Sequence, residues 1–305
     1  MSRPIIVVGS LNMDFVVRVD ALPERGQTVS GRQFTMLPGG KGANQACAAG
    51  RLGGICRMVG RVGRDVFGEQ LKASLAADGV DTTRIISTED EATGVALIPV
   101  EDGGQNLIVV AGGANLRLRP ADVEPALKEA AGGLLLLQLE SPMETVEAAV
   151  TLAHRLAMTI VLDPAPARAL SPELVGGVDI LTPNETEALV LLGRRGSAVS
   201  VAEAAEVGRQ LLNLGPRAVI LKLGANGACL IGGNGSRRFP ARRVDAVDAT
   251  AAGDTFNGAL AVALAEGRDM ADAIDFAVAA ASISVTRLGA QASIPTRDEV
   301  DDLRR

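Results

Sequence analysis

The sequence predicts a three-layer α/β fold, in which a doubly wound, mostly parallel β-sheet lies between two layers of helices and a small antiparallel sheet stands beside it. Short apolar segments alternate with longer helical patterns along the chain. The apolar segments are continuous rather than alternating, as expected for parallel strands that are buried on both faces. Two segments in the N-terminal half break this rhythm, because they contain strand patterns and turns without a helix between them.

The strands of the main sheet are expected to begin with Ile5–Val8, an apolar run that Gly9 ends. The other candidate strands share this apolar character and lie at Leu134–Leu139, Thr159–Leu162, Asp179–Leu181 and Ala218–Leu223. Helical patterns are found at Pro142–Ala157, Asn184–Leu192, Val201–Leu214, Gly253–Glu266 and Asp269–Thr286. The last of these is apolar almost all round, which predicts that this helix is buried.

The small sheet is predicted from two insertions, Phe15–Met36 and Gly94–Val110, whose turns fall at Pro23–Gly26 and Glu101–Gly104. A sheet this short would expose an apolar face unless it covers a cleft or pairs with another copy. We therefore expect a single domain over residues 1–305, with the small sheet as an elaboration at approximately residues 14–38 and 93–112.

The composition argues against several classes of function. The chain has a net charge of −6 without a basic tract, and six Phe but no Trp or Tyr, so no nucleic-acid partner is expected. A single His and three Cys without a CxxC pattern disfavour a zinc site, and free thiols suit a reducing compartment. Because the sequence has no signal-peptide pattern and no apolar run of about 18 residues, we expect a cytoplasmic protein without membrane contact.

The strongest local pattern is Asp248–Gly258, where small residues precede Asp254 at the start of a predicted helix. Small side chains leave the backbone N–H groups of Ala251 to Asp254 open, and the helix dipole adds partial positive charge, which favours an anion site. Asp254 can then act as a base while the N–H groups hold a phosphoryl group. The alternative is that Asp254 simply caps the helix.

A second candidate site lies in Pro38–Gln45, where adjacent glycines permit a ligand to approach the backbone closely. The segment is not a P-loop, because Gly42 follows the lysine where Ser or Thr is required. A flexible turn with a surface lysine is an equally good explanation of the pattern. The polar and glycine residues of interest are Gly39, Gly40, Lys41 and Asn44.

Further polar residues follow predicted strands, where ligands bind in open α/β sheets. Asn12 and Asp14 would share one face of an extended segment, although an Asx turn would explain them equally well. Glu140 follows another strand, where it could instead cap the next helix. Asn184 and Glu187 lie one helical turn apart, so both could face one ligand or hydrated cation, and they also fit a capping box.

Two remaining features have simple structural explanations. Leu223–Gly227 joins two predicted strands, and its spacing indicates a tight turn. His154 lies within a predicted amphipathic helix, where a structural or solvated side chain is expected. The chain has no Gly-x-Ser-x-Gly elbow that would support a Ser-His-Asp hydrolase.

Taken together, these motifs resemble the PfkB carbohydrate kinase family, also called the ribokinase family. Gly39–Asn44 resembles its N-terminal signature, Asp248–Gly258 its C-terminal signature, and Asn184–Glu187 its Asn-x-x-Glu motif. Other similar segments follow in the family's order over essentially the whole chain, at Gly9–Asp14, Gln138–Pro142, Pro164–Arg168 and Thr286–Gln291.

The resemblance implies ATP-dependent phosphorylation of the 5-hydroxyl of D-ribose, with Mg²⁺ and an activating K⁺. It also implies that the small sheet is a lid that pairs two subunits into a homodimer. Asp254 matches the catalytic base, and the amides of Ala251, Ala252 and Gly253 match the anion hole.

The resemblance also implies three sets of ligand-binding residues. Positions that match sugar-binding residues are Asn12, Asp14, Gly39, Gly40, Lys41, Asn44, Glu140 and Asp254. Positions that match the nucleotide and Mg²⁺ region are Asn184, Glu187, Lys222, Gly224, Ala225, Gly227, Gly253 and Val278. Positions that match a K⁺ site, where many ligands are backbone carbonyls, are Asp248, Thr250, Ser284, Arg287, Gly289 and Ser293.

The chain departs from the family pattern at three places. Lys222 stands where Thr is usual, Val278 stands where His or Asn is often found near adenine, and Asp163-Pro164 replaces a common Asn-Pro. The reaction class is unaffected, but the acceptor stays open among ribose, deoxyribose, fructose and a nucleoside such as adenosine. The intact polar set favours a small free sugar. A non-catalytic sugar-binding protein is disfavoured, because the residues matching the base and the anion hole are all present.

Overall fold

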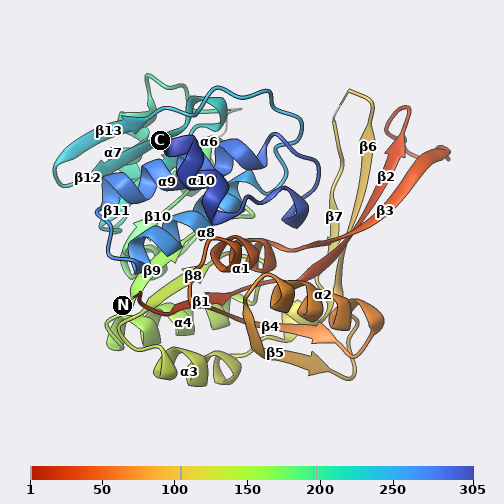
Figure 1. Cartoon of the computed structure of the whole chain (residues 1–305), viewed down its shortest axis with the longest axis horizontal. Coiled ribbons are helices and arrows are strands. Elements are labelled where there is room, and N and C mark those ends of the chain that lie inside the picture. Colours follow the sequence, from red (N-terminus) through yellow and green to blue (C-terminus); the bar gives the residue numbers. More distant parts are fainter. Residues whose placement is uncertain (1, 104, 195, 197) are drawn as a thin grey trace.

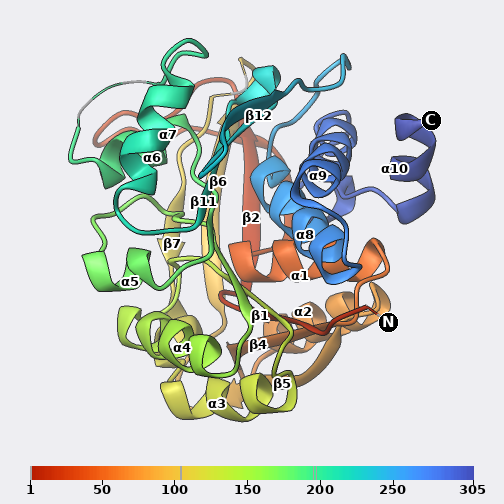
Figure 2. The ribbon, with the colours of Figure 1, turned by 90° about the vertical axis from the view of Figure 1, so that its left-hand side faces the viewer.

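The computed structural model of the protein describes residues 2–103, 105–194, 196 and 198–305. It confirms the predicted α/β class: a nine-stranded sheet has helices on both faces, and a four-stranded sheet projects from the main body (Figure 1, Figure 2). Gly104, which ends one of the predicted turns, lies outside the described residues.

The main sheet has the strand order β13-β12-β11-β10-β9-β8-β1-β4-β5. Neighbours from β11 to β5 are all parallel, and β12 and β13 add antiparallel pairs at one edge. The strands are β1 Ile5–Val8, β4 Cys56–Gly63, β5 Asp81–Thr88, β8 Leu134–Leu137, β9 Thr159–Leu162, β10 Ile180–Leu181, β11 Ala218–Lys222, β12 Ala228–Gly232 and β13 Gly235–Phe239.

The strands that the sequence predicts for this sheet are present as β1, β8, β9, β10 and β11. β4, β5 and β13 are additional to the predicted elements. In β4, Arg57 and Arg61 interrupt the apolar pattern, and each guanidinium pairs with carboxylates of neighbouring elements, among them Asp81 and Asp122. Such pairing lets a charged side chain lie in a half-buried strand.

Helices cover the two faces of the main sheet with two separate hydrophobic cores. Along β1, Ile5 and Val7 point into one core and Ile6 and Val8 into the other, as the alternation of a strand requires. The first face carries α1 Lys41–Arg51, α2 Val66–Ala77, α8 Ala252–Ala265 and α9 Met270–Ser284; the other carries α3 Pro120–Glu129, α4 Met143–Arg155, α5 Pro172–Gly176, α6 Glu185–Leu191 and α7 Ala204–Leu212. Most of α9 is buried, as predicted.

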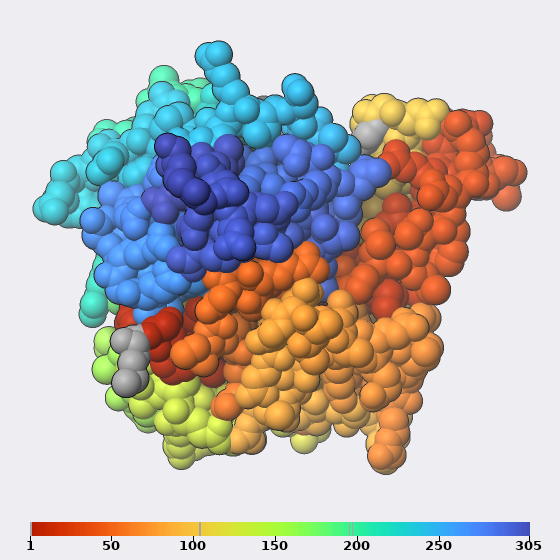
Figure 3. All heavy atoms as spheres, viewed as in Figure 1, coloured from red at the N-terminus to blue at the C-terminus, as the bar shows by residue number. Residues whose placement is uncertain are grey.

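The small sheet consists of β2 Asn12–Val19, β3 Gly31–Gly39, β6 Gly94–Glu101 and β7 Val109–Ala111, in the order β3-β2-β6-β7. Its outer pairs are antiparallel, but its central pair, β2 and β6, is parallel, which differs from the predicted antiparallel pattern. Both strands begin beside the main sheet and run outward, because each insertion leaves and re-enters the domain on the same side. The sheet stands clear of the main body in the space-filling view (Figure 3).

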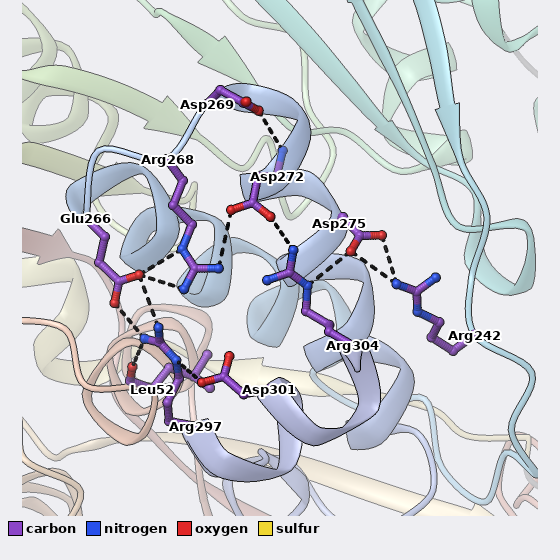
Figure 4. Close-up of polar contacts among 10 residues, drawn as sticks. All are labelled: Leu52, Arg242, Glu266, Arg268, Asp269, Asp272, Asp275, Arg297, Asp301 and Arg304. Carbon is purple, nitrogen blue, oxygen red and sulfur yellow. Dashed lines mark hydrogen bonds and ion pairs between the residues drawn. The ribbon is translucent and has the colours of Figure 1, made fainter.

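The C-terminal helix α10 Arg297–Arg304 is held on α9 by a cluster of charged residues (Figure 4). The guanidinium carbons of Arg268, Arg297 and Arg304 lie 4.7, 5.1 and 5.6 Å from the ring centroid of buried Phe276. Cations over an aromatic face are attracted by its quadrupole. The carboxylates that pair with these arginines are Glu266, Asp272, Asp275 and Asp301.

Candidate active site

The predicted catalytic and sugar-binding residues meet at the carboxyl edge of the central strands. The segments that follow β1, β8 and β9 carry Ser10, Glu140 and Asp163, and parallel strands end at a common edge. Helices α1 and α8 pack against each other there (Figure 2), and side chains near their N-termini are hydrogen-bonded, so the two N-termini lie in the same region.

Asp254 lies in the first turn of α8. The residue that directly precedes this helix is Ala251, whose φ of 58° is left-handed. The Asp254 carboxylate does not cap the helix. Instead, Asn44 Nδ2 donates to Oδ2 and Gln45 Nε2 donates to Oδ1, each over 3.0 Å. Burial raises the pKa of Asp254 to about 6; Lys41 and the two amides oppose the rise, and Asp163 adds to it. A pKa in this range suits a general base that works near neutral pH.

Asp14 lies on β2, and Gly39 lies on the adjacent strand β3, where its direct partner is Asn12, two positions before Asp14. A Cβ at Gly39 would lie 2.1 Å from Asp14 Oδ2, so only glycine leaves room for this carboxylate. Burial and the negative charges of Glu140 and Asp254 together raise the pKa of Asp14 to about 7, while Lys41 opposes the rise. An ionisable group of this kind in a cleft is typical of a ligand site.

Glu140 holds the loop after β1 to the start of α1. Its Oε2 accepts hydrogen bonds from Ser10 Oγ at 2.5 Å and from the backbone N–H of Lys41 at 3.2 Å. It therefore does not cap α4, whose N-terminus has no side-chain cap. Gly40 precedes Lys41 with φ of 89°, and a Cβ there would lie 2.7 Å from the backbone nitrogen of Asn12.

Lys41 is the positive charge at the centre of a group of carboxylates. Burial by itself lowers the pKa of Lys41, but the surrounding carboxylates outweigh this effect and raise it, so the ammonium stays protonated. Those carboxylates belong to Asp254, Asp163, Glu140 and Glu187. A fixed ammonium among acceptors can orient sugar hydroxyls, which both donate and accept hydrogen bonds.

Asn12 begins β2 and does not form the alternative Asx turn. Its orientation depends on Asn115, which the sequence did not single out. Asn115 Nδ2 donates to Asn12 Oδ1 at 2.8 Å, while Asn115 Oδ1 accepts from the backbone N–H of Leu11 at 2.9 Å. The two asparagines lie 103 positions apart in the chain, so no local pattern connects them.

Three more buried polar residues escaped the sequence-based assignment of roles: Gln45, Gln138 and Asp163. Gln45 Nε2 donates to both Asp254 and Asp163, and Gln138 Nε2 donates to Gln45 Oε1 at 2.6 Å. Asp163 also accepts from Lys222 Nζ at 2.9 Å. Two of the three departures from the family pattern, Asp163 and Lys222, therefore form an ion pair with each other.

A pocket of about 520 Å³ adjoins the N-terminus of α8, and its lining is mostly small or apolar. The predicted tight turn is present as the 3₁₀ turn η2 Gly224–Asn226, between β11 and β12. Gly227 follows it with φ of 84°, and a Cβ there would lie 2.0 Å from the carbonyl oxygen of Phe239. The predicted nucleotide-binding residues on the pocket wall are Lys222, Gly224, Ala225, Gly227, Gly253 and Val278.

Asn184 and Glu187 do not line this pocket but form the expected capping box of α6. The backbone N–H and Nδ2 of Asn184 donate to the two carboxylate oxygens of Glu187 at 2.7 and 2.9 Å. Burial raises the pKa of Glu187, while Lys222 opposes this rise. In the described part of the chain, no group of three His, Cys, Asp or Glu could hold a metal. Mg²⁺ usually binds through one or two carboxylates, phosphates and waters, so Glu187 suits an ion that arrives with the nucleotide.

The predicted K⁺ residues lie in the loop before α8 and in the segment from the last residue of α9 to the 3₁₀ turn η3 Gln291–Ser293, and Asp248 joins these two segments. Its Oδ1 accepts from the Thr250 N–H and hydroxyl at 2.9 and 2.6 Å, and its Oδ2 accepts from the Gly289 N–H at 2.9 Å. Burial acts to raise the pKa of Asp248, but these hydrogen bonds outweigh it and lower the pKa. The Arg287 guanidinium pairs with Glu299, so its backbone carbonyl, rather than its side chain, suits a cation. The hydroxyls of Ser284 and Ser293 donate to nearby carbonyls.

Two expectations concern residues outside the site. His154 is exposed on α4, in agreement with a solvated histidine. In the residues that the structure describes, no helix combines the length and the apolar character that crossing a membrane would need.

Known proteins resemble the chain over its whole length. Residues 2–297 match the family model described as pfkB family carbohydrate kinase. Ribokinase of Haemophilus influenzae is 42% identical over 301 residues, which cover 98% of this chain and 97% of that protein. Ribokinase of Bacillus subtilis is 42% identical over 302 residues, which cover 99% of each. The solved structure of Arabidopsis thaliana ribokinase complexed with ribose and ATP matches with a TM-score of 0.91 and 33% identity, covering 99% of each chain.

Proposed function

Since the chain belongs to the pfkB family of carbohydrate kinases, we propose that it transfers the γ-phosphoryl group of ATP to the 5-hydroxyl of D-ribose. The observation that carries this proposal is the position of Asp254. This buried carboxylate lies between a polar cluster of Asp14, Lys41 and Glu140 and the end of α8 that borders the apolar pocket. The names of the full-length relatives support ribose as the acceptor.

The polar cluster supplies the groups that a small sugar needs. Carboxylates accept hydrogen bonds from hydroxyls, while Lys41 and the amide groups of Asn12 and Asn44 donate them. Both Asp14 and Asp254 have raised pKa values in the unliganded protein. Hydroxyl donors from a bound sugar would replace part of the lost hydration and favour the ionised forms.

Asp254 accepts the proton of the attacking hydroxyl as the oxygen approaches the phosphorus atom. The N–H groups of Ala251 and Gly253 would face the transferring phosphoryl group, where the helix dipole and Lys222 add positive charge. The Ala252 N–H donates to the Ala249 carbonyl at 3.2 Å in the unliganded protein, so it would join them only by giving up this bond. Phosphoryl transfer needs mainly this positioning and charge stabilisation from the protein. A small sheet that closes over the sugar would exclude water and limit ATP hydrolysis.

Cations complete the proposed site. Mg²⁺ bound to the nucleotide phosphates would lie near Asn184 and Glu187, where it would neutralise phosphate charge. The carbonyls of the loops joined by Asp248, with Thr250, Ser284, Arg287, Gly289 and Ser293, are the proposed K⁺ ligands. Oxygen donors of these kinds suit both ions.

The small sheet is the proposed lid and dimer contact. Its exposed apolar side chains support this role, since a solvated sheet face normally carries polar residues. The exposed apolar residues of the sheet and its loops are Phe34, Met36, Leu97, Leu107, Ile108, Val109 and Val110. We place the enzyme in the cytoplasm, in keeping with its three free, buried cysteines.

ADP release measured with ATP and Mg²⁺ tests the proposed reaction. The acceptors are ribose, 2-deoxyribose, fructose, adenosine and none, each with and without K⁺. We expect ribose-dependent turnover that K⁺ stimulates. Preference for another acceptor would contradict ribose but keep the mechanism, and absence of turnover with sugar binding retained would contradict a kinase.

A further inference from the structure

The side-chain amide of Gln45 is shared by two carboxylates inside the protein. Gln45 lies on α1 with no exposed surface, and its Nε2 lies 3.0 Å from both Asp254 Oδ1 and Asp163 Oδ2. An amide nitrogen has two N–H donors, and carboxylates only accept. The two contacts therefore use both donors and determine which end of the amide faces the acids.

Gln138 prevents this amide from turning. Gln138 directly follows β8, and its Nε2 donates to Gln45 Oε1 over 2.6 Å. On its other side, Gln138 Oε1 fills the space next to Gly9 that a side chain would otherwise take. A Cβ at Gly9 would lie 2.0 Å from this oxygen. Gln138 has no exposed surface, so neither glutamine can touch a sugar or nucleotide directly.

The second carboxylate leads to the phosphate side of the site. Asp163 Oδ1 accepts from Lys222 Nζ at 2.9 Å. Lys222 Nζ in turn lies 3.3 Å from the point where a Cβ of Gly253 would be, at the N-terminus of α8. One buried amide thus separates the carboxylate on the sugar side from the carboxylate that holds a lysine on the phosphate side.

We propose that Gln45, locked by Gln138, is a positioning residue that aims Asp254 at the sugar hydroxyl and keeps Asp163 paired with Lys222. This inference rests on the proposed kinase function. Without the shared donors, two buried acids would face each other and compete for Lys222 and for protons. With these donors in place, Asp254 faces the sugar hydroxyl and Asp163 stays paired with Lys222.

The charge around Asp254 predicts how its titration responds. Lys41 of α1, Asp163 after β9 and Asp14 of β2 are the charged groups that act on it, together with the amides of Asn44 and Gln45. A donor to a carboxylate stabilises the ionised form, so loss of the Gln45 bond raises the pKa of Asp254. Turnover then needs a higher pH.

The test is a Gln45→Leu variant, which keeps most of the side-chain volume and removes both donors. Its acid limb of kcat/KM for ribose is expected to move to higher pH by about one to two units. At neutral pH, kcat is expected to fall about 10- to 100-fold through misplacement of the base. The sugar Kd from calorimetry should change by less than about threefold, because a residue that acts through the base alters the transition state more than binding.

Two further variants separate positioning from packing. Gln138→Leu keeps the bonds from Gln45 to both acids but frees its rotation, so the acid limb should move in the same direction by a smaller amount. Gln138→Leu also tests the proposal if Gln45→Leu does not fold. Thr255→Val is the matched control: it removes a buried hydroxyl next to Asp254 that has no hydrogen-bond partner in the described residues, and its acid limb should not move.

A readout without turnover keeps this inference separate from the proposed function. Titration of ¹³C-labelled aspartate side chains by NMR, assigned with Asp254→Asn, should give a higher pKa for Asp254 in Gln45→Leu than in the wild type. An unchanged Asp254 titration, or a loss of sugar affinity as large as the loss of kcat, would overturn the positioning role. If the wild type has no kinase activity but the titration moves, only the proposed function fails.

Discussion

The buried pair of Asp163 and Lys222 makes a sharp prediction about two of the three departures from the family pattern. The perturbation is a cycle of Asp163→Asn, Lys222→Thr and the double variant, which restores the residue types that are usual at these positions. In the wild type the two charged atoms lie 2.9 Å apart, with side chains 3% and 13% exposed. We expect each single change to destabilise the protein and the double change to be nearly neutral.

The magnitude follows from the distance and the burial. At 2.9 Å and an effective dielectric constant of about 20, the attraction is about 6 kcal/mol, most of which offsets the cost of burying two charges. Lys222→Thr leaves Asp163 buried without its cation and should cost about 3 kcal/mol. Asp163→Asn should cost less, about 1–2 kcal/mol, because Lys222 lines the pocket and can regain water. Because the double variant is expected to be nearly neutral, the coupling energy should be about 4–5 kcal/mol.

Urea unfolding of the four proteins measures the coupling, and KM for ATP measures the ligand role. If Lys222 contacts phosphate, the double variant regains stability but keeps a raised KM for ATP. Additive losses of stability, with a coupling below about 0.5 kcal/mol, would refute the reasoning. They would mean that the two charges are already solvated or bound to other groups.

Four other predictions follow from the site and the lid. Asp254→Asn should bind ribose but lose about 10²- to 10⁴-fold in kcat, and wild-type kcat/KM should fall as the pH drops through about 6; retained activity would contradict the base. Asp14→Asn should stabilise the unliganded protein at pH 8 by up to about 4 kcal/mol. The pKa of Asp14 is about 7 in the folded protein against an ordinary 3.8, so its ionised form destabilises the fold above pH 7. Equal urea unfolding curves of the variant and the wild type at pH 8 would contradict this. Gly227→Ala, with positive φ and a Cβ 2.0 Å from a carbonyl oxygen, should lose at least about 2 kcal/mol, against about 1 kcal/mol for Gly224→Ala, which has open space; similar losses in urea would argue against the clash. Ile108→Asp, on the exposed apolar surface of the small sheet, should convert the proposed dimer to monomers in light scattering, and an unchanged mass would exclude this surface from the proposed dimer.

Local patterns were sufficient for the parts of the protein that depend on neighbours in the chain. Apolar runs predicted β1, β8 and β9, because a parallel strand buried on both faces must be apolar throughout. The small residues before Asp254 predicted the start of a helix, and α8 begins there without a side-chain cap, although the Ala252 N–H donates to the Ala249 carbonyl. The Asn184–Glu187 spacing predicted a capping box, which also forms. Each depends on residues within a few positions of one another.

The charged strand β4 and the polar support of the site could not be predicted in this way. Arg57 and Arg61 interrupt the apolar run of β4, so the hydrophobic pattern does not reveal this strand. Their carboxylate partners come from other elements. Gln45 and Asp254 are 209 positions apart, and Gln45 and Asp163 are 118 apart. A glutamine in a helix has no local mark that it will lie between two acids.

The sequence by itself determined the family, the fold class and the identity of the chemical groups, since motifs and periodicity are properties of neighbouring residues. Only the tertiary structure decided which groups share hydrogen bonds. It paired Asp163 with Lys222, gave Asp254 its two amide donors, and raised the pKa values of Asp14 and Asp254 by burial. These properties depend on distances across the packed core and on exclusion of water, which arise when α1, α8 and the strand ends come together.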